Sequence, residues 1–180
     1  MANTRLSEKA LYVERGYGQV EPNHLSAQRT AQIYAQLPAK SDITILENGQ
    51  FVKYNYADNV VDFEGAGEWM LVFNEVKIYG DKEVENDFAM KKENYTAAYY
   101  NAAGTTMPGG STMVPRVFKT NIGDIYTTNT VASESLEVGN ILTVGDDGYL
   151  KVGEGDMKWE VVKVYTLADR QRAVKIMRIA

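Results

Sequence analysis

Apolar and polar residues alternate along much of the chain after residue 42, and this pattern predicts β-strands. Val52, Tyr54 and Tyr56 alternate with Lys53 and Asn55, which is the period of a strand with one buried face and one wet face. A short strand is expected just before it at 43–46, and Asn48-Gly49 between the two is typical of a hairpin turn. Further strands are expected at 68–79, 114–120, 141–144, 149–152, 159–166 and 173–179.

Turn signals separate these expected strands about every ten residues, a spacing typical of small all-β domains. Gly145-Asp146-Asp147-Gly148 and Ala168-Asp169-Arg170-Gln171 each join two neighbouring strands. The pattern predicts a mainly all-β fold, arranged as a small β-barrel or β-sandwich. The stretch 81–113 is less regular, and we expect a loop or helical insertion there, with Pro108-Gly109-Gly110 at its centre.

Residues 1–42 lack the alternation, so we divide the chain into an extended N-terminal arm, 1–42, and a β-rich body, 43–180. Leu25, Ile33 and Leu37 are spaced in multiples of four, which allows a short helix from Leu25 to Leu37. Such a helix is too short to be stable alone. Two interpretations stay open: the arm orders against a partner, or it wraps its own domain.

Composition narrows the possible functions. The net charge of −5 argues against a general nucleic-acid binder, which needs a basic surface. The chain has no cysteine, so disulfides and thiolate chemistry are excluded, and this suits folding in a cytoplasm. Neither a signal peptide nor a run long enough to cross a bilayer is recognisable. We therefore expect neither a nucleic-acid nor a membrane partner.

Residues able to support catalysis are few. The only histidine is His24, and its place in the arm is a poor one for a catalytic triad. Two acidic groups, one at 58–68 and one at 146–156, could in principle serve a glycoside hydrolase. Both lie in glycine-containing turns, where aspartate is favoured for backbone reasons. We expect the turn role, and hence no enzyme and no catalytic residue.

Phosphate-binding and metal-binding motifs are not recognisable, so we expect no cofactor and no metal. Aromatic rings could instead form a carbohydrate-binding platform. Tyr95, Tyr99 and Tyr100 are the best candidates, beside Trp69 and Trp159. Core packing explains the two tryptophans more simply.

Two stretches carry a resemblance to a known family. One is Gly67–Tyr79, continued by Asp87–Lys91, and the other runs from Gly123–Asn129 through Leu136–Asn140 to the final strands. Together, over roughly 67–180, they resemble auxiliary (decoration or cement) head proteins of tailed bacteriophages. The likeness lies in the kinds of residue and in the order of the segments, and it includes no catalytic residue.

The resemblance implies a structural virion protein, made in the host cytoplasm, that binds and stabilises or decorates the outside of an assembled capsid. Its expected partners are the major capsid protein and other copies of itself, either in a homo-oligomer or as neighbours on the capsid. A carbohydrate- or receptor-binding module on a phage particle is the alternative. Arginine and tyrosine are frequent in binding hot spots, so we predict that the arm contacts its partner through Tyr12, Arg15, Tyr17, His24, Arg29 and Tyr34.

Overall fold

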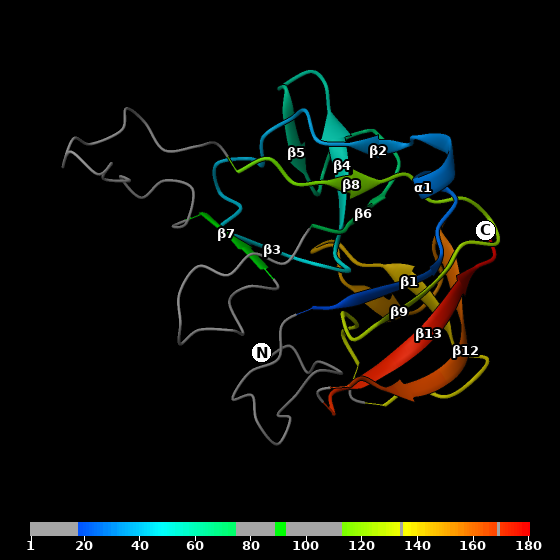
Figure 1. Ribbon diagram of the computed structural model, residues 1–180. Coiled ribbons are helices and arrows are strands. Elements are labelled where there is room, and N and C mark those ends of the chain that lie inside the picture. The colour runs from blue at the N-terminus through cyan, green and yellow to red at the C-terminus, as the bar shows by residue number, and fades with distance from the viewer. Residues whose placement is uncertain (1–17, 75–88, 93–112, 134, 169) are drawn as a thin grey trace.

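The computed structural model is mainly β, with three antiparallel sheets and one helix of four residues in the part of the chain that it describes (Figure 1). The described residues are 18–74, 89–92, 113–133, 135–168 and 170–180. The all-β prediction is confirmed. The barrel expectation is corrected, because none of the described sheets closes on itself.

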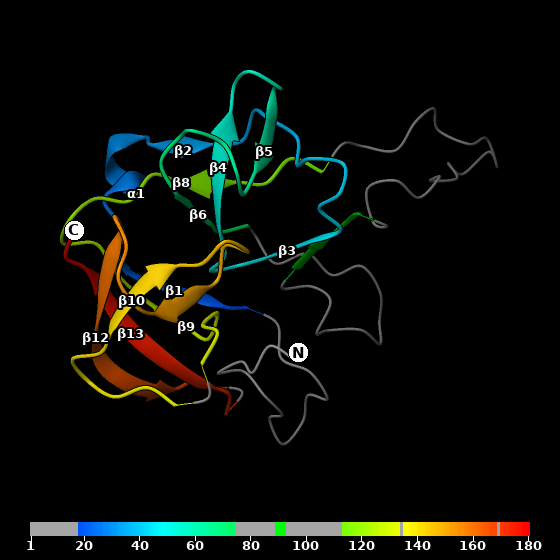
Figure 2. The same cartoon turned by 180° about the vertical axis from the view of Figure 1, so that it is seen from behind.

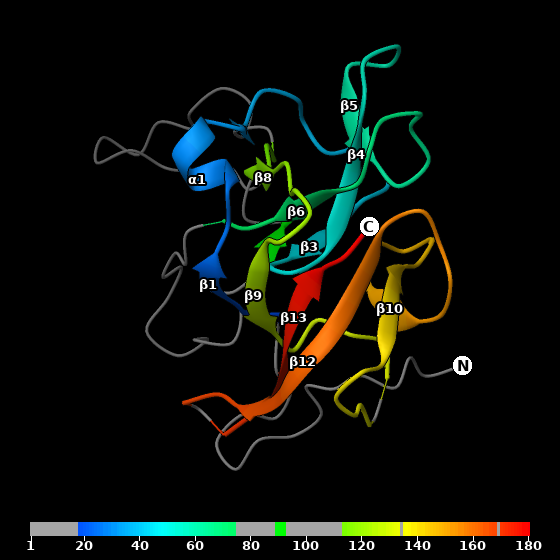
Figure 3. The same ribbon diagram turned by 90° about the vertical axis from the view of Figure 1, so that its right-hand side faces the viewer.

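The largest sheet has six strands and contains most of the C-terminal third. Figure 3 shows β1, β9, β13, β12 and β10 following one another across it. Both predicted C-terminal hairpins are confirmed, since β12 pairs with β13 and β10 pairs with β11. In spatial order the strands are β1 (Val20–His24), β9 (Ile125–Thr128), β13 (Arg172–Arg178), β12 (Lys158–Thr166), β10 (Ile141–Val144) and β11 (Leu150–Val152).

A five-stranded sheet lies beside the first, and a two-stranded sheet completes the described fold; Figure 2 shows both from behind. The five strands in order are β2 (Ile33–Tyr34), β8 (Val117–Phe118), β6 (Met70–Val72), β4 (Phe51–Asn55) and β5 (Val60–Asp62). The two strands are β3 (Ile45–Glu47) and β7 (Ala89–Lys91).

The five-stranded sheet is buried on both faces, which explains its many apolar residues. Phe51, Leu71 and Phe118 belong to a first core that also contains Trp159 and Tyr126 of the six-stranded sheet. Their neighbours along the strands face a second core, as the period of two requires. Those neighbours are Val52, Tyr54, Met70, Val72 and Val117. Burial of Trp159, which is fully inaccessible, confirms the core-packing interpretation of that residue.

The helix predicted for Leu25–Leu37 is wrong except for one turn, α1 (Ala27–Thr30). Ala31 ends it in the left-handed conformation, at φ 55°, and the chain then extends so that β2 can pair with β8. Leu25 and Ile33 contact the first core while Leu37 contacts the second. Tertiary contacts in two directions therefore override a weak helical pattern.

Residues 18–42 are part of the chain's own fold. β1 pairs with β9, β2 pairs with β8, and Ala39 bridges Val61 of β5. Of the two interpretations given for residues 1–42, the described portion therefore matches the second, a segment that wraps its own domain. Residues 1–17 lie outside the described part.

The Asn48-Gly49 turn is present, but the hairpin expected around it is wrong. Gly49 has a φ of +92°, whereas Asn48 is not among the residues with positive φ. The type I′ hairpin turn, for which Asn-Gly is typical, needs positive φ at both positions. Gln50 N–H donates to Glu47, and the chain passes from β3, which pairs with β7, to β4, which pairs with β5 and β6.

Other predicted elements are shorter than expected. The strand expected at 68–79 is confined to Met70–Val72 up to residue 74, and that expected at 114–120 to Val117–Phe118. In the expected insertion at 81–113, residues 89–91 form β7. Residues 75–88 and 93–112 lie outside the described part.

Candidate functional site: an acidic cleft between sheets

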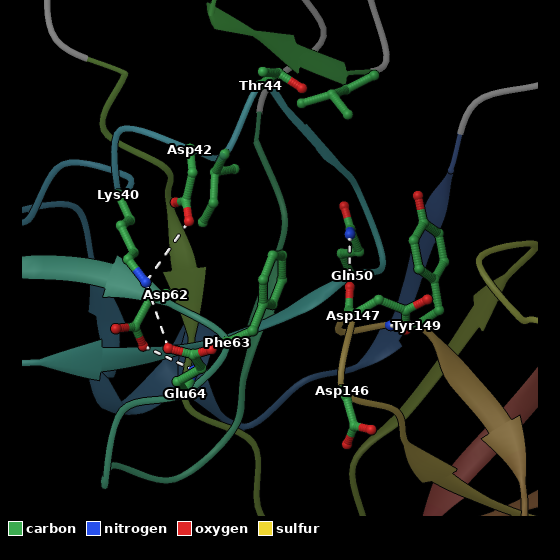
Figure 4. Close-up of a pocket in the computed structure, with 12 residues that line it drawn as sticks. Lys40, Asp42, Thr44, Gln50, Asp62, Phe63, Glu64, Asp146, Asp147 and Tyr149 are labelled. Carbon is green, nitrogen blue, oxygen red and sulfur yellow. Dashed lines mark hydrogen bonds and ion pairs between the residues drawn. The ribbon is translucent and has the colours of Figure 1, made fainter.

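A cleft of about 370 Å³ brings together the two acidic groups that lie far apart in the sequence (Figure 4). Asp62 and Glu64 line it from the end of β5, and Asp146 and Asp147 line it from the β10–β11 turn. The side chain of Phe63 lies between these two groups. Five carboxylates, one lysine and an apolar part line the cleft. The carboxylates are Asp42, Asp62, Glu64, Asp146 and Asp147, the lysine is Lys40, and the apolar residues are Ile43, Ile45 and Phe63.

Lys40 is the single cation that lines the cleft, and it contacts two of the five carboxylates. Its ammonium lies 3.7 Å from Asp42 and 3.4 Å from Glu64. The charge of Asp42, followed by that of Glu64, raises the pKa of Lys40. All three side chains are exposed, so these ion pairs contribute little to stability. The cleft keeps a large excess of negative charge.

Asp62 holds the loop that follows it. Its carboxylate accepts hydrogen bonds from the backbone N–H of Gly65 at 2.6 Å and of Glu64 at 3.1 Å. The side chain of Asn55 donates a third bond at 2.9 Å. Burial, the largest single influence, raises the pKa of Asp62, but the hydrogen bonds from Asn55, Gly65 and Glu64 together outweigh it and lower the pKa. A carboxyl held ionised in this way is unsuited to act as the general acid of a glycosidase.

Asp147 and Gln50 join the two larger sheets. Asp147 accepts from the backbone N–H of Tyr149, and its own backbone oxygen accepts from the Gln50 side chain at 2.9 Å. Gln50 also accepts from the N–H of buried Glu47, whose carboxylate receives the Tyr149 hydroxyl at 2.8 Å. The turn role predicted for the acidic residues is thus confirmed for Asp62 and Asp147.

The structure places three of the six predicted contact residues. His24 is exposed at the end of β1 and Arg29 is exposed on α1. Tyr34 is half-buried on β2, where its ring meets that of Tyr54 edge-on at 5.8 Å between centroids. Tyr34 therefore contacts its own second core. Tyr12, Arg15 and Tyr17 lie outside the described residues.

Part of the suggested aromatic platform is excluded by burial. Trp159 is inaccessible, and Trp69 is half-buried with the Lys53 ammonium 4.5 Å above its ring. Tyr95, Tyr99 and Tyr100 lie outside the described part. The exposed aromatic ring that the structure adds is that of Tyr56, which is 69% exposed.

Two rigid turns expose apolar side chains that the sequence analysis missed. Ile122 is 72% exposed and Val138 is 64% exposed. Each precedes a glycine with positive φ, Gly123 at +92° and Gly139 at +90°. Both turns have the pattern polar, apolar, glycine, polar, which is visible in the sequence. The exposure of the apolar side chain is not visible there.

The side chain that ends each turn also fixes its start. Asp124 accepts from the backbone N–H of Asn121 at 2.9 Å, and Asn140 accepts from that of Glu137 at 2.9 Å. The glycines also bond to the sheet, Gly123 N–H to Arg178 and Gly139 N–H to Val161. Ile122 and Val138 are therefore presented by backbone held at both ends.

Comparisons with protein-family models, with curated proteins and with solved structures found no match to this chain. Among the described residues, no helix has the length and apolar character needed to cross a membrane. In the same residues, no group of three acidic or histidine side chains is arranged to hold a metal ion.

Proposed function

We propose that this protein is an auxiliary structural protein of a tailed-bacteriophage head, which binds the outside of the assembled capsid. The resemblance that supports this proposal covers most strands of the largest sheet and one strand of the five-stranded sheet. Its two stretches include β6 of the five-stranded sheet and β9 to β13, five of the six strands of the larger one. A sandwich-like arrangement belongs to the proposal, since the first core draws side chains from both of these sheets.

The observation that carries the proposal is the pair of turns at Asn121–Asp124 and Glu137–Asn140. Each exposes one branched apolar side chain, Ile122 or Val138, on a fixed backbone. Removing an exposed apolar side chain from water against a partner surface is favourable. Because the backbone that carries these side chains is already held by hydrogen bonds, binding does not have to order the turns. Such a surface suits adhesion to another protein.

Selective binding to the assembled shell follows if one copy contacts more than one capsid subunit. A second contact made by an already bound molecule gains from a high effective concentration. A protein that binds only the assembled state stabilises it by mass action. The proposal therefore expects tight binding to assembled heads and weak binding to free capsid subunits.

The test is co-sedimentation of the purified protein with undecorated heads of the phage that encodes it, and with free capsid subunits for comparison. The double variant Ile122→Asp with Val138→Asp should bind heads at least about tenfold more weakly, because it places charges in an apolar contact. Tyr56→Asp is the matched control, since it charges an equally exposed apolar residue elsewhere. We expect it to bind as the wild type does.

Failure of the wild-type protein to sediment with heads would reject the proposed function. Binding to purified host glycans instead, read on a glycan array, would favour the receptor-binding alternative. Equal binding by the double variant would retain the head as partner but remove the two turns from the contact.

A further inference from the structure

The pairing of the strands shows which residues lie on the outer face of the six-stranded sheet. Val174 and Ile176 of β13 are buried in the first core, so Lys175 and Met177 point to the opposite face. Strand pairing aligns Met177 with Ile125 on one side and with Glu160 on the other. One row across this outer face is thus largely apolar: Ile125, Met177 and Ile141, with Glu160 between the last two.

The next row contains two lysines directly opposite each other. Lys163 of β12 is the register partner of Lys175 of β13. Like charges in directly opposed positions destabilise a sheet. Among the residues that the structure describes, no carboxylate makes an ion pair with either lysine. The Lys163 ammonium instead lies over the ring of Tyr165, 5.7 Å from its centroid. The two lysines therefore form a positive site without an ion pair in the described part of the chain, beside a mainly apolar row; Glu21 lies in the lysine row beyond Thr127.

The acidic cleft lies toward the other end of the same sheet. Ile141 pairs with Glu160 and Thr143 with Lys158, so β10 advances toward its turn as the numbering along β12 decreases. The turn residues Asp146 and Asp147 lie beyond the Lys158 end, whereas Lys163 lies beyond Glu160 in the opposite direction. One end of the sheet carries the two lysines, and the turn beyond its other end contributes Asp146 and Asp147 to the cleft.

We propose that copies of this chain associate head to tail, with the Lys163–Lys175 pair of one copy against the acidic cleft of the next. Each surface joins charge of one sign to apolar side chains, Ile125 and Met177 beside the lysines and Phe63 and Ile45 in the acidic cleft. Carboxylates of the neighbour relieve the repulsion between the two lysines, and the lysines offset the charge of the cleft. This association does not depend on the proposed function.

The arrangement of the two surfaces determines the kind of assembly. A symmetric dimer through the lysine pairs would bring four like charges together, which opposes association. Two different surfaces at opposite ends give a heterologous contact, which forms a ring if it closes and a chain if it does not. The contact is electrostatic in part, so salt weakens it.

The test is sedimentation velocity of the full chain over a range of concentrations. At about 0.05 M salt the mean mass should increase with concentration, and at about 0.5 M salt this increase should be largely lost. The basic-end variant, Lys163→Glu with Lys175→Glu, should raise the dissociation constant at least about tenfold. The acidic-end variant, Asp146→Lys with Glu64→Lys, should do the same.

Mixing the two variants provides the decisive measurement. The substituted basic end of one variant now complements the substituted acidic end of the other, so the equimolar mixture should associate better than either variant alone. Lys151→Glu is the control, because Lys151 is exposed on β11 and belongs to neither surface; it should associate as the wild type does. Circular dichroism and thermal unfolding verify that each variant is folded.

Three results would overturn the inference. The first is a wild-type protein that stays monomeric at every concentration and salt tested. The second is association that is insensitive to both double variants although they fold. The third is a mixture that associates no better than its separate components, which would mean that the two ends do not meet. Binding to phage heads is not part of this measurement, so its outcome is independent of the proposed function.

Discussion

At the scale of single residues, glycines show where backbones approach one another too closely for any side chain. Gly148, in the β10–β11 turn, has a φ of +78°, and a Cβ there would lie 2.2 Å from the backbone oxygen of Phe51. Gly139 has a φ of +90°, and a Cβ there would meet no atom within 4 Å. An alanine would be strained by the positive φ at both positions, but it would clash with neighbouring atoms only at Gly148. Comparing the two positions therefore separates backbone strain from steric clash.

We expect Gly139→Ala to lower the free energy of unfolding by about 1–2 kcal/mol, the cost of a left-handed alanine. Gly148→Ala should lower it by at least about 3 kcal/mol, because the added methyl group also pushes β4 away from the turn. Urea denaturation of both variants measures the difference. Equal losses would mean that the close approach of Gly148 to Phe51 is relieved without cost.

Asp62 gives a pH-dependent prediction at the same scale. Its pKa is lowered in the folded state, against the pull of burial, by bonds from Asn55, Gly65 and Glu64. Such a group contributes stability that is present above the unfolded pKa of about 3.9 and is lost as the pH falls through the lower folded pKa. Asp62→Asn should therefore cost about 1–2 kcal/mol at neutral pH.

That cost should shrink as the pH falls below the unfolded pKa of about 3.9 and through the lower folded pKa, because the wild-type carboxylate is then protonated and as neutral as the asparagine amide. Denaturant titrations of both proteins between neutral and acidic pH measure it. Asp146→Asn is the control, since Asp146 lines the same cleft but is exposed, and it should change stability by less than about 0.5 kcal/mol. A cost for Asp62→Asn that is independent of pH would assign the effect to packing.

At the scale of elements, local pairing was predictable and distant pairing was not. The β12–β13 and β10–β11 hairpins join neighbouring strands across short turns, so alternation and turn residues suffice to find them. β1 pairs with β9 more than a hundred residues away, and its sequence, with Pro22 and Asn23, is not typical of a strand. β1 is a strand because it pairs with β9, and nothing in the sequence of residues 20–24 predicts that pairing.

The same distinction applies to the candidate surfaces. The opposed lysines follow from the register of one hairpin, Thr166 with Arg172 and hence Lys163 with Lys175, so they could have been found from the sequence. The acidic cleft could not, because residues 40–64 and 146–147 meet only when two sheets pack together. The turn role of Asp62 and Asp147 was predicted, since short-range hydrogen bonds to backbone are a local property.

At the scale of the whole molecule, the N-terminal segment connects both larger sheets. β1 is an edge strand of one and β2 an edge strand of the other, and α1 lies between them in the chain. Leu25 and Ala27 are buried at 3% and 0% exposure. Gly18 is also enclosed, because a Cβ there would lie 2.2 Å from the backbone oxygen of Asn48. The folded domain therefore begins well before residue 43.

Two truncations separate the part of the N-terminus that folds with the domain from the part that remains a candidate arm. Removing residues 1–36 deletes β1, α1 and β2, exposing the first core where Leu25 and Ala27 lay. Loss of one buried leucine alone costs about 2–5 kcal/mol, and a domain has only about 5–15 kcal/mol of net stability. We expect this truncation to be insoluble or to lack a cooperative thermal transition.

Removing residues 1–17 instead deletes Tyr12, Arg15 and Tyr17 but keeps every described strand, and it should unfold cooperatively. If the arm contacts a capsid, this shorter truncation should bind heads less tightly and protect them less against thermal disruption than the full chain does. Equal protection would remove residues 1–17 from the contact, and a cooperative transition in the longer truncation would show that β1 and β2 are dispensable for folding.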